Sequence, residues 1–147
     1  MLPKKILLCT DFSENSEQAR TCAVEYAKAF GSELHILHVV DSWAGLPAYS
    51  EGVYVHVADA FGQMQELSNA KLEETRNLCG ADVPIKTHSK TGVASDEIVR
   101  LADEESVDLI VMGTHGWTGF KHLLLGSVAE RVLRTATCPI MVVRPSQ

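Results

Sequence analysis

The stretch DLIVMG, residues 108–113, carries the strongest strand signal in the chain. Its apolar residues are continuous rather than alternating, which is typical of a strand buried on both faces of a sheet. Lys5–Thr10, Leu34–Val40 and Pro139–Val143 have the same character, and Pro84–Lys90 is a more polar segment expected at a sheet edge. Continuous apolar strands of this kind predict a mostly parallel sheet.

Amphipathic helical patterns lie between these strands. They cover about residues 13–30, 58–78, 95–105 and 127–134. Strands that alternate with helices predict an α/β domain, and right-handed crossovers place helices on both faces of the sheet. Ligands of such sheets bind beyond the carboxyl ends of the strands, where the strand order reverses. The residues just after Thr10, Val40 and Met112 are therefore the first candidates for a site.

The region between the second strand and the second helix is less regular in its pattern. Asp41 to about His56 contains two glycines and a proline, so we expect an irregular connection there, a variable flap at about 42–57 that is either a functional lid or a mobile segment. The helix that follows should bury its apolar side chains against the sheet. Those expected to face inward are Phe61, Met64, Leu67 and Leu78.

Length and charge restrict the classes of function. The 147 residues fit one domain, and the formal net charge of −6 argues against nucleic acid as a partner. An acidic protein can still bind a small anion locally, through backbone N–H groups or a helix terminus. No apolar run is long enough to span a membrane. The four cysteines form no C-x-x-C pair and are expected to be free thiols in a reducing cytoplasm.

The loop after DLIVMG holds the most informative motif. Residues 113–127 read GTHGWTGFKHLLLGS, so that Gly113 and Gly116 are followed, after nine residues, by Gly126 and Ser127. Gly113, directly after a buried strand, allows positive φ and lets a ligand reach the backbone. Gly126 and Ser127 open a helix, whose N-terminus attracts anions. The spacing alone leaves two interpretations open, an anion-binding loop or a long turn punctuated by glycines. It is neither a P-loop nor a dinucleotide-binding turn.

The G-x-x-G-x9-G-[ST] arrangement resembles the nucleotide-binding motif of the universal stress protein family, in its ATP-binding branch. The resemblance extends over nearly the whole chain outside the flap and the helix after it. The segments that carry it are ILLCTDFSENSEQA (6–19), LHVVD (37–41), TGVASDEIV (91–99), DLIVMGTHG (108–116), LLLGSVAERVL (123–133) and CPIMVVRP (138–145). It implies an open five-stranded parallel sheet of order 3-2-1-4-5 with helices on both faces, Rossmann-like and similar to the adenine nucleotide alpha hydrolase-like fold.

The resemblance also implies roles for single residues around the nucleoside. Asp11 is expected near the ribose or a phosphate-bound metal, and Thr10 belongs to the same turn. Val39, in the HV pair of the second strand, is expected to meet the adenine. Met112 and Gly113 are expected to line the site from the fourth strand.

The phosphates are expected at the glycine-rich loop. By the same resemblance Gly116, Gly126, Ser127 and Val128 surround them, largely through backbone N–H groups. Gly92, after the third strand, matches a family position beside the site. Mg²⁺ is expected to be held mainly through the phosphates, with Asp11 as the one candidate side-chain ligand.

Other side chains have two interpretations each. Cys9 stands where many family members have proline, which changes a wall of the adenine pocket; as a thiol it is either redox-sensitive or an inert core residue. His115 either assists a departing γ-phosphate or supports the loop. His35 and His38 are three apart on a strand, so they point to opposite faces and are not expected to bind one metal ion together.

The sequence therefore predicts an ATP-binding stress-response or signalling module, with ADP or AMP as alternative ligands and slow hydrolysis at most. No arginine stands in the loop to stabilise a phosphoryl transition state. The alternative is a nucleotide-independent interaction protein of the same family. The resemblance further implies a homodimer that pairs through the last strand. It leaves the client or signalling partner unnamed.

Overall fold

The computed structural model describes residues 2–41, 51–115 and 125–145, with the backbone alone for residues 51–56. Strands and helices alternate as the sequence predicts. The elements are β1 (Lys5–Cys9), α1 (Glu14–Phe30), β2 (Glu33–Asp41), α2 (Glu51–Leu78), β3 (Ile85–Gly92), α3 (Ala94–Glu104), β4 (Leu109–Gly113), α4 (Ser127–Thr135) and β5 (Ile140–Val143).

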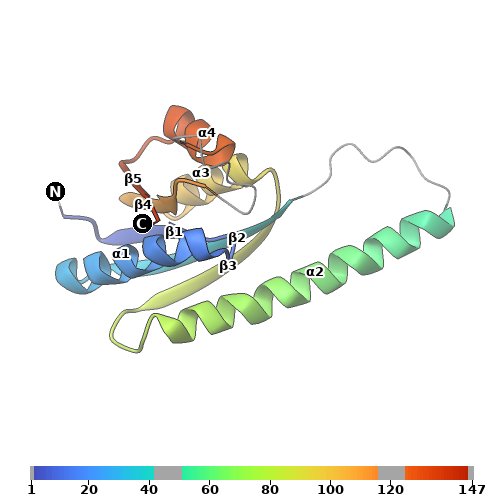
Figure 1. Cartoon of the computed structure of the whole chain (residues 1–147), viewed down its shortest axis with the longest axis horizontal. Coiled ribbons are helices and arrows are strands. Elements are labelled where there is room, and N and C mark those ends of the chain that lie inside the picture. The colour runs from blue at the N-terminus through green and yellow to red at the C-terminus, as the bar shows by residue number, and fades with distance from the viewer. Residues whose placement is uncertain (1, 42–50, 116–124, 146–147) are drawn as a thin grey trace.

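The strands form one sheet of order β3-β2-β1-β4-β5, and every neighbouring pair is parallel (Figure 1). This confirms the predicted fold class and the edge position of the polar strand β3. Ile6 of β1 is in register with Leu34 of β2 on one side and with Leu109 of β4 on the other. The strand order therefore reverses at β1 and β4, whose carboxyl ends form the switch point.

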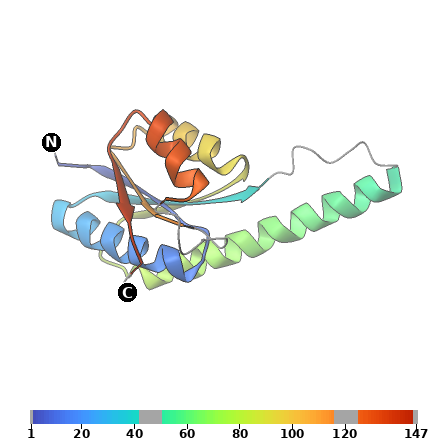
Figure 2. The same ribbon diagram turned by 45° about the horizontal axis from the view of Figure 1, so that its top comes forward.

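Helices α1 and α2 cover one face of the sheet, and α3 and α4 cover the other (Figure 2). The alternation of side chains along β1 divides the core in the same way. Ile6 and Leu8 pack with Ala23 of α1, whereas Leu7 packs with Ile98 of α3. All three β1 side chains are completely buried. A strand buried on both faces explains the continuous apolar pattern of its sequence.

The predicted flap is shorter than expected at its carboxyl end. Helix α2 begins at Glu51, so residues 51–56 are helical and the prediction of an irregular chain as far as His56 was wrong. Residues 42–50 lie outside the part of the chain that the structure describes. At 1.5 Å per residue the 28 residues of α2 span about 42 Å, and the helix projects well past the sheet (Figure 1).

The inward face of α2 also differs from the prediction. Met64, Leu67 and Leu78 are 49%, 57% and 61% exposed, whereas Ser68 and Leu72 are buried against the sheet. A long helix can rotate about its own axis, and its position over the sheet decides which side packs against the strands. The mixed pattern of apolar residues in α2 does not determine this rotation. Met64 and Leu67 instead face the cavity described below.

The two ends of α1 are stabilised differently. Ser13 is the N-cap residue but its side chain makes no capping hydrogen bond, whereas Gly31 has φ 67° and ψ 34°, the left-handed conformation typical of a glycine after a helix. The four cysteines are all free thiols. Within the described ranges no helix is both long and apolar enough to cross a membrane.

Candidate functional site

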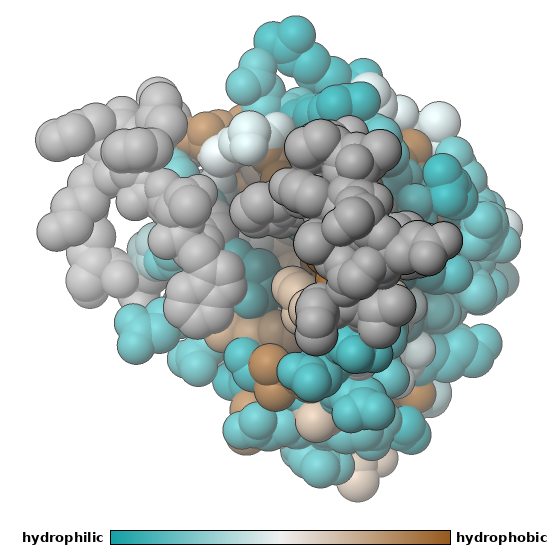
Figure 3. All heavy atoms as spheres, turned by 90° about the vertical axis from the view of Figure 1, so that its right-hand side faces the viewer, coloured by the Kyte–Doolittle hydropathy of each residue, from teal (hydrophilic) through white to brown (hydrophobic). Residues whose placement is uncertain are grey.

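A cavity of about 900 Å³ opens at the carboxyl ends of β1, β2 and β4. Helix α2 borders it on one side, and the first turn of α4 borders it on the other. Figure 3 faces this end of the molecule and shows a hollow with apolar surface inside it. The cavity thus lies at the switch point, where sheets of this kind bind their ligands.

The structure brings most of the predicted site residues to this cavity. Gly116 lies outside the described residues, and Gly92 does not line the cavity. The predicted residues that do line it are Cys9, Thr10, Asp11, Val39, Met112, Gly113, His115, Gly126, Ser127 and Val128.

The turn between β1 and α1 forms one wall. The Phe12 N–H donates to Thr10 Oγ1 at 3.0 Å, and the Ser13 N–H donates to Asp11 Oδ1 at 3.0 Å. Phe12 itself has φ 64°, an unusual conformation for an aromatic residue. These two side-chain acceptors stabilise the turn, so that the Asp11 carboxylate is held at the cavity wall by the chain around it.

His38 supports this turn from β2. Its Nδ1–H donates to the Thr10 carbonyl oxygen at 2.9 Å, and its ring lies 4.3 Å from the Phe12 ring, centroid to centroid. Burial lowers the pKa of His38, so its ring is neutral at physiological pH. Lys71 Nζ of α2 also lies near Phe12, 5.5 Å from its ring centroid. Lys71 brings a positive charge to the cavity.

The two ends of the glycine-rich loop are joined where they leave the sheet. The Thr114 N–H donates to the Val143 carbonyl oxygen at 3.1 Å, and the Gly126 N–H donates to the Thr114 carbonyl oxygen at 2.7 Å. Edge strand β5 therefore anchors the start of the loop, and the start of the loop anchors the first turn of α4. The intervening residues 116–124 lie outside the described residues.

Gly113 and Gly126 are required for close packing and not for a left-handed backbone. Gly126 has φ −74°, and neither glycine is among the described residues with positive φ, so that part of the prediction for Gly113 was wrong. A Cβ on Gly113 would lie 3.0 Å from the Asn15 carbonyl oxygen, and one on Gly126 would lie 3.0 Å from the Thr114 carbonyl oxygen. Backbone neighbours at this distance cannot rotate away, so a side chain there would require the facing backbone to shift by a few tenths of an ångström.

The first turn of α4 presents polar groups to the cavity. Gly126 is its N-cap residue and no side chain caps the helix, so the N–H groups of Ser127 and Val128, at the positive end of the helix dipole, have no side-chain acceptor. His115 Nδ1 lies 3.1 Å from Thr114 Oγ1. Its Nε2 is buried and has no hydrogen-bond partner among the described residues. A bound group with anionic oxygens would satisfy these donors.

Gly92 lies beside the cavity without lining it. Its register partner Asp41 and the nearby Ala94 both line the cavity. The φ of Gly92 is 156°, and a Cβ there would lie 2.9 Å from Glu97 Oε1. The glycine lets the carboxylate of Glu97 in α3 approach the end of β3, where it also pairs with Arg100 at 2.9 Å.

Cys9 is a half-buried thiol at the cavity wall. Burial, together with the nearby Cys138, raises the pKa of the Cys9 thiol. Because the thiolate is the reactive form, the raised pKa favours the inert thiol of the two interpretations.

Sequence reasoning missed several residues that line the cavity. They are Phe12, His38, Asp41, Met64, Leu67, Lys71 and Thr114. Of these, Asp41 directly follows Val40 and was among the first strand-end candidates, although no role was assigned to it, while His38 adjoins Val39 on the same strand and could have been included by the same rule. Met64, Leu67 and Lys71 follow the i, i+3, i+7 spacing of one helix face, but only the structure shows what that face borders.

Comparison with known proteins agrees with this geometry. A family model described as the universal stress protein family matches residues 3–144. Universal stress protein MJ0531 of Methanocaldococcus jannaschii is 40% identical over 145 residues, which cover 97% of this chain and 83% of that protein. The solved structure of MJ0577 from the same organism is 32% identical and has a TM-score of 0.84 over 100% of this chain and 99% of that one. A universal stress protein solved in complex with cAMP is 26% identical, with a TM-score of 0.72 over 99% of this chain and 100% of that one.

Proposed function

The chain belongs to the universal stress protein family, and we propose that its cavity binds an adenine nucleotide, ATP first, with ADP or AMP as alternatives. One observation carries the proposal. Residues from β1, β2, β4 and α4 that are far apart in the sequence line one cavity at the switch point. The structurally similar family member in complex with cAMP supports the same ligand class.

The cavity has the size and the chemistry for such a ligand. Its volume of about 900 Å³ is within the range of small-molecule sites. Apolar Val39 and Met112 offer a surface for the adenine ring, while the uncapped N-terminus of α4 offers donors for phosphate oxygens. The unpartnered His115 Nε2 is a further polar atom that a ligand would satisfy.

Mg²⁺ would accompany a triphosphate. It prefers oxygen ligands and keeps several waters, so the phosphates would hold most of it. Asp11 is the protein carboxylate that the β1–α1 turn holds at the cavity wall, and it fits a single direct or water-mediated contact. The ion would neutralise phosphate charge in a protein whose formal net charge is −6.

The proposed role is that of a switch in a stress response. Rapid hydrolysis needs a positioned cation near the transferred phosphoryl group and a residue that orients water. No arginine lines the cavity in the part of the chain that the structure describes. We therefore expect slow hydrolysis at most, with the nucleotide stabilising one conformation or oligomer. A cytoplasmic location remains a prediction.

Strand β5 connects the cavity to the edge of the sheet where a second copy of the chain would bind. β5 is an edge strand, and its Val143 carbonyl accepts the hydrogen bond that anchors the loop start. We expect β5 to pair with its equivalent in a homodimer. Val142→Pro removes an N–H that alternates away from β4, so sedimentation at micromolar concentration should change from dimer to monomer. A monomeric unmodified protein would contradict this part of the proposal.

Mass spectrometry can identify a nucleotide that is bound to the purified protein. Freshly purified protein is denatured, and released nucleotides are measured by mass spectrometry against the protein concentration. We expect ATP, ADP or AMP in near-stoichiometric amount, or else calorimetric binding of Mg-ATP by the empty protein. If neither is found, the nucleotide-independent interaction protein becomes the better explanation.

A further inference from the structure

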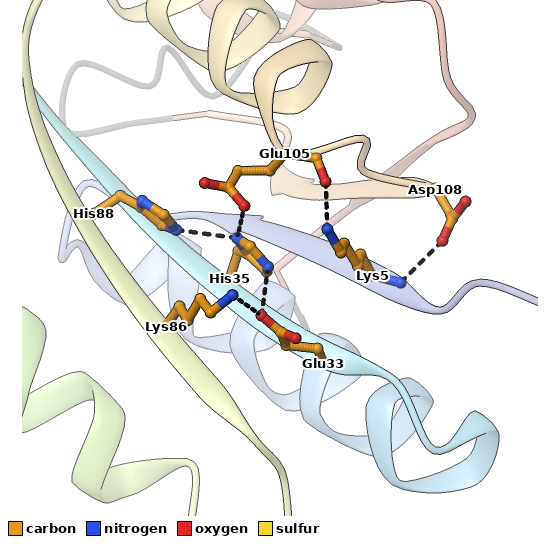
Figure 4. A network of polar contacts seen from close by, with 7 residues as sticks. All are labelled: Lys5, Glu33, His35, Lys86, His88, Glu105 and Asp108. Carbon is orange, nitrogen blue, oxygen red and sulfur yellow. Dashed lines mark hydrogen bonds and ion pairs between the residues drawn. The ribbon is translucent and has the colours of Figure 1, made fainter.

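A second polar cluster lies away from the cavity, on the face of the sheet covered by α3 and α4. It contains His35 of β2, His88 of β3 and Glu105, the residue that ends α3 (Figure 4). In the register of the sheet His88 is opposite Leu37, which is two residues beyond His35 and therefore on the same face. The two imidazoles are consequently diagonal neighbours.

We propose that His35, His88 and Glu105 form a binding site for a divalent transition-metal ion of the zinc class. His35 Nδ1 lies 3.0 Å from His88 Nε2 and 4.0 Å from Glu105 Oε2, and the three ligand atoms are within 4.8 Å of one another. Ligands at 2.0–2.2 Å from a tetrahedral zinc ion lie about 3.4 Å apart. Relative movements of up to about 1.4 Å between the ligand atoms would therefore give a His₂Glu site with one position open to water.

Glu33 acts as an orienting partner of this site. Its Oε1 lies 3.0 Å from His35 Nε2, the ring nitrogen that points away from the proposed metal ion. A carboxylate at this nitrogen favours the Nε2–H tautomer and leaves the Nδ1 lone pair for the metal, as in many histidine-ligated sites. Both Glu33 Oε1 and His35 Nε2 are buried, and their 3.0 Å contact falls short of good hydrogen-bond geometry, while Glu33 Oε1 also forms an ion pair with Lys86 Nζ at 2.8 Å. A small rotation of His35 on binding the ion would correct this.

The proposed site is reachable from solvent. The His35 side chain is fully buried, while the side chains of Glu105 and Glu33 are 32% and 29% exposed. Lys86 Nζ pairs with Glu33 at 2.8 Å, and Lys5 Nζ donates to the Glu105 carbonyl oxygen at 2.7 Å, so neither ammonium is paired with the Glu105 carboxylate. Figure 4 accordingly shows the Glu105 carboxylate in contact with His35 and with neither of these two lysines.

Without an ion, the two imidazoles form a hydrogen bond to each other, in which one nitrogen donates and the other accepts. If His35 carries its proton on Nε2, His88 Nε2–H is the donor. Metal binding then requires His88 to move this proton to Nδ1 or lose it. Binding should consequently weaken as pH falls, because protons compete with the metal ion for the imidazole nitrogens.

The proposal is tested by titrating the full-length, chelator-treated protein with ZnCl₂ in a calorimeter. We expect the unmodified chain to bind one ion, and His88→Gln and Glu105→Gln each to weaken binding by more than about 100-fold, beyond the range of second-sphere changes. Glu33→Gln should weaken it about 10- to 100-fold. Glu104→Gln, the same change at the exposed neighbour of Glu105, is the matched control and should bind like the unmodified chain.

Circular dichroism establishes that the variants are folded. Cobalt(II) in place of zinc then identifies the donor atoms, because thiolate ligands give an intense near-ultraviolet charge-transfer band that imidazole and carboxylate ligands do not give. A thiolate band, unchanged affinity in the folded His88→Gln and Glu105→Gln variants, or no binding at micromolar zinc would each overturn the proposal. The outcome is independent of whether the cavity binds a nucleotide.

Discussion

The two halves of strand β2 border two polar regions that differ in whether backbone or side-chain groups face a ligand. At its carboxyl end, His38, Val39 and Asp41 line the large cavity. In its amino half, Glu33 and His35 belong to a compact cluster of side chains. Thus one strand serves a backbone-rich site at one end and a site made of side chains at the other.

The difference lies in which groups are left to bind a ligand. At the cavity, the first turn of α4 has no side-chain cap, and Gly113 and Gly126 keep the backbone accessible. Such a surface suits a polyanion, even in an acidic protein. At the amino half, imidazole and carboxylate groups converge, which suits a cation. The net charge of the protein therefore does not decide whether a particular site binds an anion or a cation.

The largest expected effect is at the backbone-rich site. Gly126→Ala places a Cβ 3.0 Å from the Thr114 carbonyl oxygen and should displace the first turn of α4. Loss of two hydrogen bonds to a charged phosphate corresponds to a weakening of about 100-fold or more in calorimetric affinity for Mg-ATP.

Gly62→Ala is the matched control for this change. A Cβ on Gly62, in α2, has no neighbour within 4 Å, so affinity should be unchanged and α2 slightly stabilised. If Gly126→Ala and Gly62→Ala bound Mg-ATP with equal affinity, the first turn of α4 would not be part of the nucleotide site.

A smaller effect is expected at the single lysine that lines the cavity among the described residues. Lys71→Met keeps most of the side-chain volume but removes the charge beside Phe12. We expect affinity for ATP to fall about 10-fold, the value of one charge-assisted contact, and affinity for adenosine to change little. Lys28→Met removes a lysine paired with exposed Asp82 and serves as the control. A uniform loss for ATP and adenosine would indicate a packing defect instead.

The smallest effect concerns the pH dependence of stability. Burial lowers the pKa of His35, of His38 and of His88, so all three take up protons less readily in the folded chain than in the unfolded one. The unfolded chain therefore binds more protons between the folded pKa values and about 6.5, and the free energy of unfolding falls as pH falls through that range.

Urea unfolding at about pH 7.5 and about pH 5.5 measures this dependence. Glu33 and Glu105 oppose the shift of His35 by favouring its charged form, while Lys86 adds to the shift. Replacing His88 by Gln removes one titrating group, so the decline in stability with falling pH should become shallower. A steeper decline in His88→Gln would contradict the burial argument.

Much of the fold could be predicted from the strands alone. The continuous apolar segments around Leu7 and Val111 require burial on both faces, and the polar segment around Thr87 is compatible only with an edge. The predicted strand-end residues Thr10, Val39 and Met112 reach the cavity because parallel strands end at the same side of a sheet.

Other features depend on tertiary placement and were not predictable. The rotation of α2 decides that Met64 and Leu67 border the cavity rather than the core. His35 and His38 were expected on opposite faces, and the opposite clusters of core residues around them agree with this. The sequence did not reveal the partner of His35, because His88 is brought beside it only by the register of β2 and β3.

An amide nuclear magnetic resonance titration with Mg-ATP tests the central claim most directly, because it follows both ends of β2 in one experiment. We expect the largest amide shifts at Asp11, Val39, Gly113 and Ser127, with little change at His35. Shifts concentrated around His35 and Glu105, or no shifts at millimolar Mg-ATP, would contradict the assignment of the cavity as the nucleotide site.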